Sequence, residues 1–275
     1  MSPVSAQDLA DAAEDYAYAV ANCAGCTDYH ATRPYLVLSG ERMGAERDKE
    51  QFGALASGLF PASGDLLIAG AADAGLLEFA LDVLGTRLHQ VHVADLCPSP
   101  LHASERLAKR RSAPLTTFVR DLTAAAPFGS YDMIIAHLIL HFMPPAGRLR
   151  YLRLLQQMLK PGGVVIVATS GGRLVPRAPG DHAQQILDAL AERHISLPAT
   201  VSELRARIAS IVNRPPTESA MVDLQHSDRN FDPDEFRTSG AYEAAGLRIV
   251  DVHKFHSDNG GRTRRRTYTV AKAAP

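Results

Sequence analysis

The 275-residue chain has almost no net charge, because 29 lysine and arginine residues balance 30 aspartate and glutamate residues. A protein that binds nucleic acid or an anionic membrane surface usually carries a basic field that draws the partner in. The chain also has no apolar run of the ~20 residues that a helix needs to cross a bilayer. We therefore expect neither nucleic acid nor a membrane as a partner.

Cysteine is scarce, with three residues in the chain, and an odd number does not make a disulfide framework. Cys23 and Cys26 form a lone C-x-x-C motif with no second pair and no histidine at zinc-finger spacing, so the sequence predicts no metal site. The first residues are acidic and lack the basic start and apolar core of a signal peptide. The expected location is the cytoplasm.

Short apolar runs with the length and β-branched content of buried strands recur along the chain, with amphipathic helical segments between most of them. The runs cover residues 65–70, 89–95, 115–121, 131–140, 164–170, 247–255 and 264–272. This alternation predicts an α/β fold with a doubly wound, mostly parallel sheet. A short polar loop joins the last two runs, so we expect seven strands that end in an antiparallel hairpin.

Two regions depart from the strand-helix alternation. Residues 1–60 are predicted to form an N-terminal helical lid, with a helix over 6–24 and further helical parts broken by Pro34 and Gly40. Residues 171–235 contain two helical patterns and are predicted to be a helical insertion. The remaining chain, within residues 61–275, is then one α/β domain.

The segment from Asp121 to Ser170 contains a buried strand, an amphipathic helix, the sequence LKPGG and a second buried strand. Proline ends a helix, and the glycines can supply positive φ before the next strand. This segment, together with the terminal hairpin, resembles the class I, Rossmann-like methyltransferases that use S-adenosylmethionine (SAM), of the bacterial small-molecule type. The resemblance implies SAM as the cofactor.

The sequence GAADAG at residues 70–75 follows the first strand and leads into a helix, which suits a turn that passes close to a nucleotide. Taken alone it fits a weakened dinucleotide fingerprint, a degenerate first motif of the methyltransferases, or a tight turn without a ligand. About 65 residues precede the turn and a hairpin closes the sheet, which favours the methyltransferase over an NAD-binding fold.

The resemblance places the cofactor along the carboxyl ends of the first four strands. Asp95 would accept the ribose hydroxyls and Asp121 would contact the adenine amino group, although a solvated strand end and a turn cap are the respective alternatives. Arg33 could pair with the methionine carboxylate, or lie in an exposed loop. The full set of predicted cofactor residues is Gly70, Ala72, Asp73, Gly75, Asp95, Leu96, Asp121, Leu122, Ala136 and Arg33.

Three residues are candidates for catalytic roles. His137 ends the fourth strand, where a general base could reach the acceptor, whereas His141 is expected to pack structurally. Tyr29 and His30 belong to an aromatic cluster upstream of the glycine-containing turn, and this cluster could close over the methionine end of the cofactor.

The sequence thus predicts SAM-dependent methyl transfer to a small-molecule acceptor, in secondary metabolism. One alternative keeps the cofactor but cyclises SAM to azetidine-2-carboxylate with release of methylthioadenosine. Another is a non-catalytic binding subunit of the same fold, which the degenerate first motif makes plausible. The sequence leaves the acceptor atom and the oligomeric state open.

Overall fold

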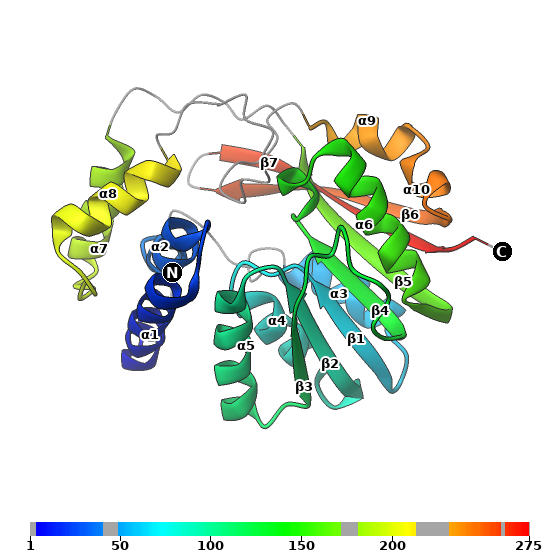
Figure 1. Ribbon diagram of the computed structural model, residues 1–275, viewed down its shortest axis with the longest axis horizontal. Helices are drawn as coiled ribbons and strands as arrows, with labels where there is room; N and C mark the ends of the chain where they lie inside the picture. The colour runs from blue at the N-terminus through cyan, green and yellow to red at the C-terminus, as the bar shows by residue number, and fades with distance from the viewer. Residues whose placement is uncertain (1–3, 41–48, 172–180, 213–230, 260–261, 275) are drawn as a thin grey trace.

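The computed structural model describes residues 4–40, 49–171, 181–212, 231–259 and 262–274 (Figure 1). One seven-stranded sheet has the order β3-β2-β1-β4-β5-β7-β6. The strands are β1 (Gly64–Ala69), β2 (Leu88–Asp95), β3 (Leu115–Val119), β4 (Tyr131–His137), β5 (Leu159–Gly171), β6 (Leu247–Asn259) and β7 (Arg262–Ala273). The first five pair in parallel, and β7 runs antiparallel to both β5 and β6. The predicted fold class is confirmed, including the terminal hairpin.

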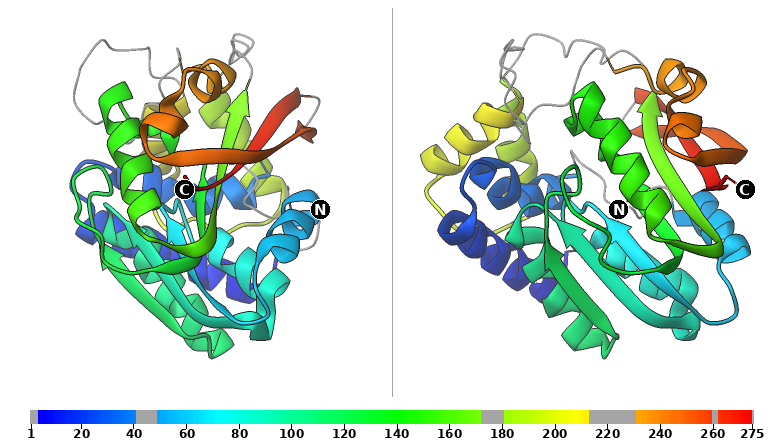
Figure 2. Two further views of the ribbon diagram at one scale, coloured as in Figure 1. Left: turned by 90° about the vertical axis from the view of Figure 1, so that its right-hand side faces the viewer. Right: turned by 45° about the vertical axis from the view of Figure 1, so that its right-hand side comes forward.

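Helices cover both faces of the sheet, because alternate strand residues point to opposite sides (Figure 2). Leu66 and Ile68 of β1 pack with α3 (Lys49–Leu59), α4 (Gly75–Leu84) and α5 (Pro98–Arg111). The intervening Leu67 packs on the other face, against α6 (Pro145–Gln157) and α10 (Ala241–Ala244). This two-sided burial explains the continuous apolar runs of the sequence.

Four helices form a separate unit beside the carboxyl edge of the sheet, which we call the helical cap (Figure 1). They are α1 (Ala6–Asn22), α2 (Thr27–Leu38), α7 (His182–Glu192) and α8 (Val201–Val212). Their apolar side chains share one buried cluster, so the predicted lid and the predicted insertion pack together. In contrast, α3 lies within residues 1–60 but packs in the sheet core through Phe52. Within the described ranges, no helix is long and apolar enough to span a membrane.

One predicted helix break is wrong. Pro34 lies inside α2 rather than ending it, and the helix continues to Leu38. The proline removes one backbone hydrogen bond, but Tyr35 and Leu36 are almost completely buried directly after it and hold the helix by packing. Pro98 is the first residue of α5, where its missing N–H costs nothing.

Two details complete the fold around the sheet. Lys160 lies in β5, and its Nζ is 2.7 Å from both Asp65 and Asp132 at the amino edge of the sheet. The segment before β6 holds two short helices, α9 (Pro233–Thr238) and α10. Gly240 separates them with a φ of 79°.

Candidate functional site

The turn between β1 and α4 requires glycine at its first position. Gly70 has a φ of +88°, and a Cβ there would lie 2.9 Å from Cγ1 of Ile139, which follows β4. Its N–H donates to the carbonyl of Ala94 at 2.8 Å, which fixes the turn to β2. The turn is therefore held close to the neighbouring strand ends, as the sequence pattern predicts.

Asp95 ends β2 and is buried, with 7% of its surface exposed. Its Oδ2 accepts the amide of Ala71 at 2.9 Å, and its Oδ1 accepts the amide of Cys97 at 2.8 Å. Burial raises the pKa of this carboxyl to about 6, although the two amides and His30 act in the opposite direction. Asp95 is thus ionised at neutral pH and joins the glycine turn to the start of α5. A solvated strand end, the alternative considered for this residue, does not describe it.

Asp73 and Arg33 form an ion pair between the glycine turn and α2, with 2.7 Å between Oδ2 and Nε. Burial acts to raise the pKa of Asp73, but Arg33 and the amide of Gly75 outweigh it and lower the pKa below its usual value. Arg33 was predicted to meet the cofactor carboxylate or to lie in an exposed loop. The structure shows it half-buried in α2 and paired with a side chain of the turn.

Tyr29 and His137 approach the same edge from the cap and from the sheet. The Tyr29 ring lies 6.4 Å from Phe142, which follows β4, and Tyr29 acts electrostatically on Arg33. His137 stacks on Phe52 at 5.9 Å and is close enough to Asp73 to lower its pKa. Tyr29, Arg33, Asp73 and His137 are thus brought together.

The other predicted cofactor residues differ in burial and in the contacts they make. Asp121 Oδ1 accepts the amide and the hydroxyl of Thr123 at 2.8 and 2.7 Å, which is the geometry of a turn cap. Leu122 packs beside Ala136 in the cluster beneath α6, whereas Leu96 is 43% exposed. An adenine contact at Asp121 stays a prediction.

Two more residues of the predicted set lie in the glycine turn. Gly75 begins α4, and its amide donates to Asp73. Ala72 lies between β1 and α4 and is partly exposed. His141 accepts the amide of Ser170 through Nε2 at 3.1 Å, in agreement with a structural role.

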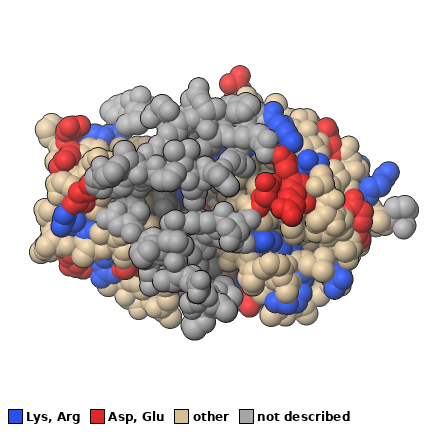
Figure 3. Space-filling view, turned by 90° about the horizontal axis from the view of Figure 1, so that it is seen from above, with Lys and Arg blue, Asp and Glu red and all other residues tan. Residues whose placement is uncertain are grey.

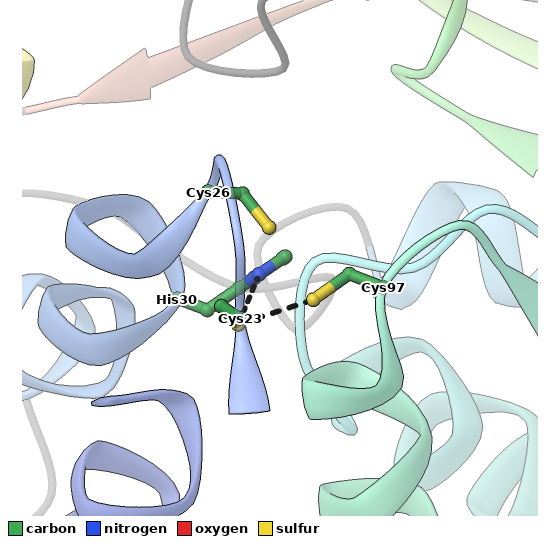
Figure 4. Close-up of side chains that lie close together, drawn as sticks. All are labelled: Cys23, Cys26, His30 and Cys97. Carbon is green, nitrogen blue, oxygen red and sulfur yellow. Dashed lines mark hydrogen bonds between the residues drawn. The ribbon is translucent and has the colours of Figure 1, made fainter. Parts of the chain in front are cut away.

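One group of side chains was not expected from the sequence. Cys97, at the start of α5, lies beside Cys23 and Cys26, and His30 completes the group (Figure 4). Hydrogen bonds with Cys26 and Cys97 lower the pKa of the Cys23 thiol. His30, predicted to be catalytic, therefore lies among thiols. Sequence reasoning missed the group because Cys97 is 74 positions from Cys23. The one available signal was a third cysteine two residues after the strand-end Asp95.

Charged side chains of both signs are mixed over the described part of the face seen in Figure 3. A groove of about 630 Å³ lies over α7 and α8 and is lined by Gln184, Ser202 and Arg205 among others. None of the predicted cofactor residues lines this groove. The candidate site is therefore the carboxyl edge of the sheet, where Arg33, Asp73, Asp95 and His137 lie.

Comparisons with known proteins bear on the fold and on one domain of the chain. Residues 67–165 match the family model described as a methyltransferase domain. A search of curated proteins finds no match. The fold is similar to a Burkholderia thailandensis 1,6-didemethyltoxoflavin-N1-methyltransferase solved with 1,6-didemethyltoxoflavin and S-adenosylhomocysteine (TM-score 0.56, 15% identity, covering 100% of this chain and 93% of that one).

Two other solved structures share the fold at low identity. One is a SAM-dependent methyltransferase from Clostridium acetobutylicum (TM-score 0.53, 11% identity, covering 88% of this chain and 97% of that one). The other is a SAM-dependent methyltransferase from Methanosarcina mazei (TM-score 0.51, 12% identity, covering 80% and 98%). Residues 67–165 thus match a methyltransferase domain, and the chain has the class I, Rossmann-like fold that these SAM-dependent methyltransferases share.

Proposed function

We propose that this protein transfers a methyl group from SAM to a small-molecule acceptor held between the carboxyl edge of the sheet and the helical cap. The observation that supports this most is the group formed by the glycine turn, the buried carboxylate Asp95 and the cap residue Arg33 at one edge. In open α/β sheets, ligands bind at the carboxyl ends of the strands.

The residues at this edge fit an adenosine-bearing cofactor. A Cβ at Gly70 would collide with Ile139 and strain the positive φ, so glycine is needed for the backbone to turn this close to the strand ends. Asp95 is ionised, and each of its oxygens can accept a ribose hydroxyl in addition to the amide that it already accepts. Leu122 and Ala136 belong to the buried apolar cluster beneath α6. When bound, SAM supplies an electron-poor methyl carbon on a sulfonium sulfur.

The work of the protein is then to orient an acceptor and to exclude water. Tyr29 and Arg33 lie on α2, so the cap positions them over the turn. We assign to His137 the removal of a proton where the acceptor atom carries one, because it ends β4 at this same edge. The acceptor is small in this proposal since α2 already contacts the turn and the β4 end.

A role in secondary metabolism is part of the proposal. It is supported by the Burkholderia thailandensis structure, which has a small heterocyclic acceptor bound and spans the full length of this chain. Action in the cytoplasm, where SAM is made, is the corresponding expectation.

The test is incubation of the protein with SAM and a panel of small hydroxyl, amine and thiol compounds, followed by mass spectrometry. We expect S-adenosylhomocysteine together with an acceptor heavier by one methylene unit, and we expect His137→Gln to slow turnover of protonated acceptors only. Methylthioadenosine without a methylated product would show SAM cyclisation instead. Binding of S-adenosylhomocysteine with neither product would favour a non-catalytic subunit.

A further inference from the structure

Three separate segments bring all three cysteines of the chain to one place. Cys23 follows the last residue of α1, Cys26 precedes α2, and Cys97 lies between β2 and α5. His30, one turn into α2, adds an imidazole to the three thiols. In Figure 4 the four side chains point toward one another across the junction of the cap and the sheet.

The spacing of these side chains suits a single metal ion. Their four donor atoms lie within 4.8 Å of one another. Cys23 Sγ lies 3.2 Å from Cys97 Sγ and 3.6 Å from His30 Nδ1. A tetrahedral ion with Zn–S bonds of ~2.3 Å and a Zn–N bond of ~2.0 Å separates its ligand atoms by about 3.5–3.8 Å. Shifts of well under the length of one bond therefore admit the ion.

The group lies where water has little access and where two helices begin. Cys26, His30 and Cys97 are between 3% and 7% exposed. Cys26 and Cys97 are the N-cap residues of α2 and α5, and neither makes a side-chain capping hydrogen bond. The positive ends of two helices thus face sulfur atoms that have no competing capping role.

Second contacts orient two of the thiols. Asp95 Oδ1 accepts the backbone amide of Cys97, and the Ser99 hydroxyl lies 2.9 Å from Cys23 Sγ. Such outer contacts are typical of metal ligands and fix their direction.

We propose that Cys23, Cys26, His30 and Cys97 bind one Zn²⁺ ion in a closed, structural site that fastens the helical cap to the carboxyl edge of the sheet. Three thiolates and one imidazole complete the tetrahedron, so no position is left for a substrate or a reactive water. A single imidazole among sulfurs at these short spacings suits zinc, whereas a cluster of several irons holds its ligands farther apart. Binding releases the thiol protons to solvent, and no redox step is involved.

Metal content is the first test. The full-length protein, purified without chelator under reducing conditions and passed through gel filtration, should retain about one zinc per chain by plasma mass spectrometry. Cys97→Ser and His30→Ala should lower the zinc content at least about fivefold. His89→Ala is the matched control, because His89 is exposed at the amino end of β2 and outside the group. Equal zinc content in all four proteins, or none in the wild type, overturns the proposal.

A second measurement does not depend on the variants being folded. Wild-type protein stripped with a chelator is titrated with Co²⁺, which should give thiolate charge-transfer and intense tetrahedral visible bands that saturate at one equivalent. If stripping unfolds the cap, zinc should restore it, which supports the site in the same way. The absence of such bands in protein with three titratable thiols contradicts the proposal. A disulfide between any two of the cysteines, seen as a loss of two mass units, contradicts it as well.

Discussion

The helical cap and the α/β body each have an apolar interior, but the junction between them is built from other kinds of contact. The cap packs around one apolar cluster, which includes Tyr35 and Leu190. The body has two, one on each face of the sheet, with Leu67 in one and Ile135 in the other. The junction between them instead contains ion pairs and sulfur. Arg33 meets Asp73, Arg106 meets Asp11 and Asp15, and three cysteines meet one histidine.

This difference has a consequence for function. Apolar packing is not specific in direction and is hard to reverse, whereas a junction of charges and ligands responds to salt, pH and metal. We therefore expect salt, pH and metal to act on the junction and to leave both apolar cores intact. We expect substitutions in the cap, in the body and at the junction to have different measurable effects.

The largest effect should come from the cap core. Leu190→Ala removes a fully buried side chain and should lower the free energy of unfolding of the cap by about 2–5 kcal/mol. Hydrogen exchange should quicken in α1, α2, α7 and α8 while the strands of the sheet stay protected. Leu67→Ala, the matched variant in the body, should instead quicken hydrogen exchange in the strands of the sheet. Equal loss of protection everywhere in both variants would show that cap and body form one cooperative unit.

The next effect concerns Asp95. Asp95→Asn keeps an oxygen that can accept the amide of Cys97 but removes the charge. Loss of a charge-assisted hydrogen bond costs about 1.5–3 kcal/mol, so the affinity for S-adenosylhomocysteine should fall about 10- to 100-fold. Calorimetry measures this affinity. Asp188→Asn is the control, because it removes a carboxylate that is exposed on α7. Unchanged affinity with lowered stability would make Asp95 purely structural.

A smaller, pH-dependent effect is expected at the Arg33–Asp73 pair. The pKa of Asp73 is lowered in the folded protein, so the pair stabilises the fold above the unfolded pKa of ~3.9 and ceases to do so as the pH falls through the folded value. Arg33→Gln should cost about 1–2 kcal/mol at neutral pH and less near pH 3. Urea unfolding across this range checks the sign. A cost that grows toward low pH would contradict the assignment.

The smallest effect belongs to the ion pairs between α1 and α5. Arg106 Nη1 lies 2.7 Å from Asp15, and its Nε lies 3.2 Å from Asp11. Arg106→Gln should cost at most about 1 kcal/mol, and high salt should reduce the difference by screening. Thermal unfolding at low and high salt measures both quantities, with Arg111→Gln, paired with Asp82 inside the body, as the comparison. A cost that high salt does not reduce would point to packing rather than charge.

The sheet could be predicted from the sequence because its signals are local. Strand length, the helix between β4 and β5 and the positive φ of Gly162 follow from neighbouring residues. The same holds for Gly70, whose place after a short buried strand marks a tight turn. Helix ends are harder to predict. Packing lets α2 continue through Pro34, and Pro98 fits α5 because it is the first helical residue.

The junction could not be predicted, because its partners are distant in sequence. Arg33 and Asp73 are 40 positions apart, and Cys23 and Cys97 are 74 apart. A lone C-x-x-C motif indicates no metal until the fold supplies a third thiol. Asp95 was recognised as a strand-end carboxylate, but its buried bonds to two amides depend on the turn and on α5.

Hydrogen exchange with and without S-adenosylhomocysteine tests most directly whether the cofactor binds at the carboxyl edge beneath the cap. We predict that the ligand slows exchange in residues 70–75, around Asp95 and in α2, and leaves the amino edge near Lys160 unchanged. NAD at the same concentration should change nothing. Protection confined to α7 and α8, or protection by NAD at residues 70–75, would contradict the account.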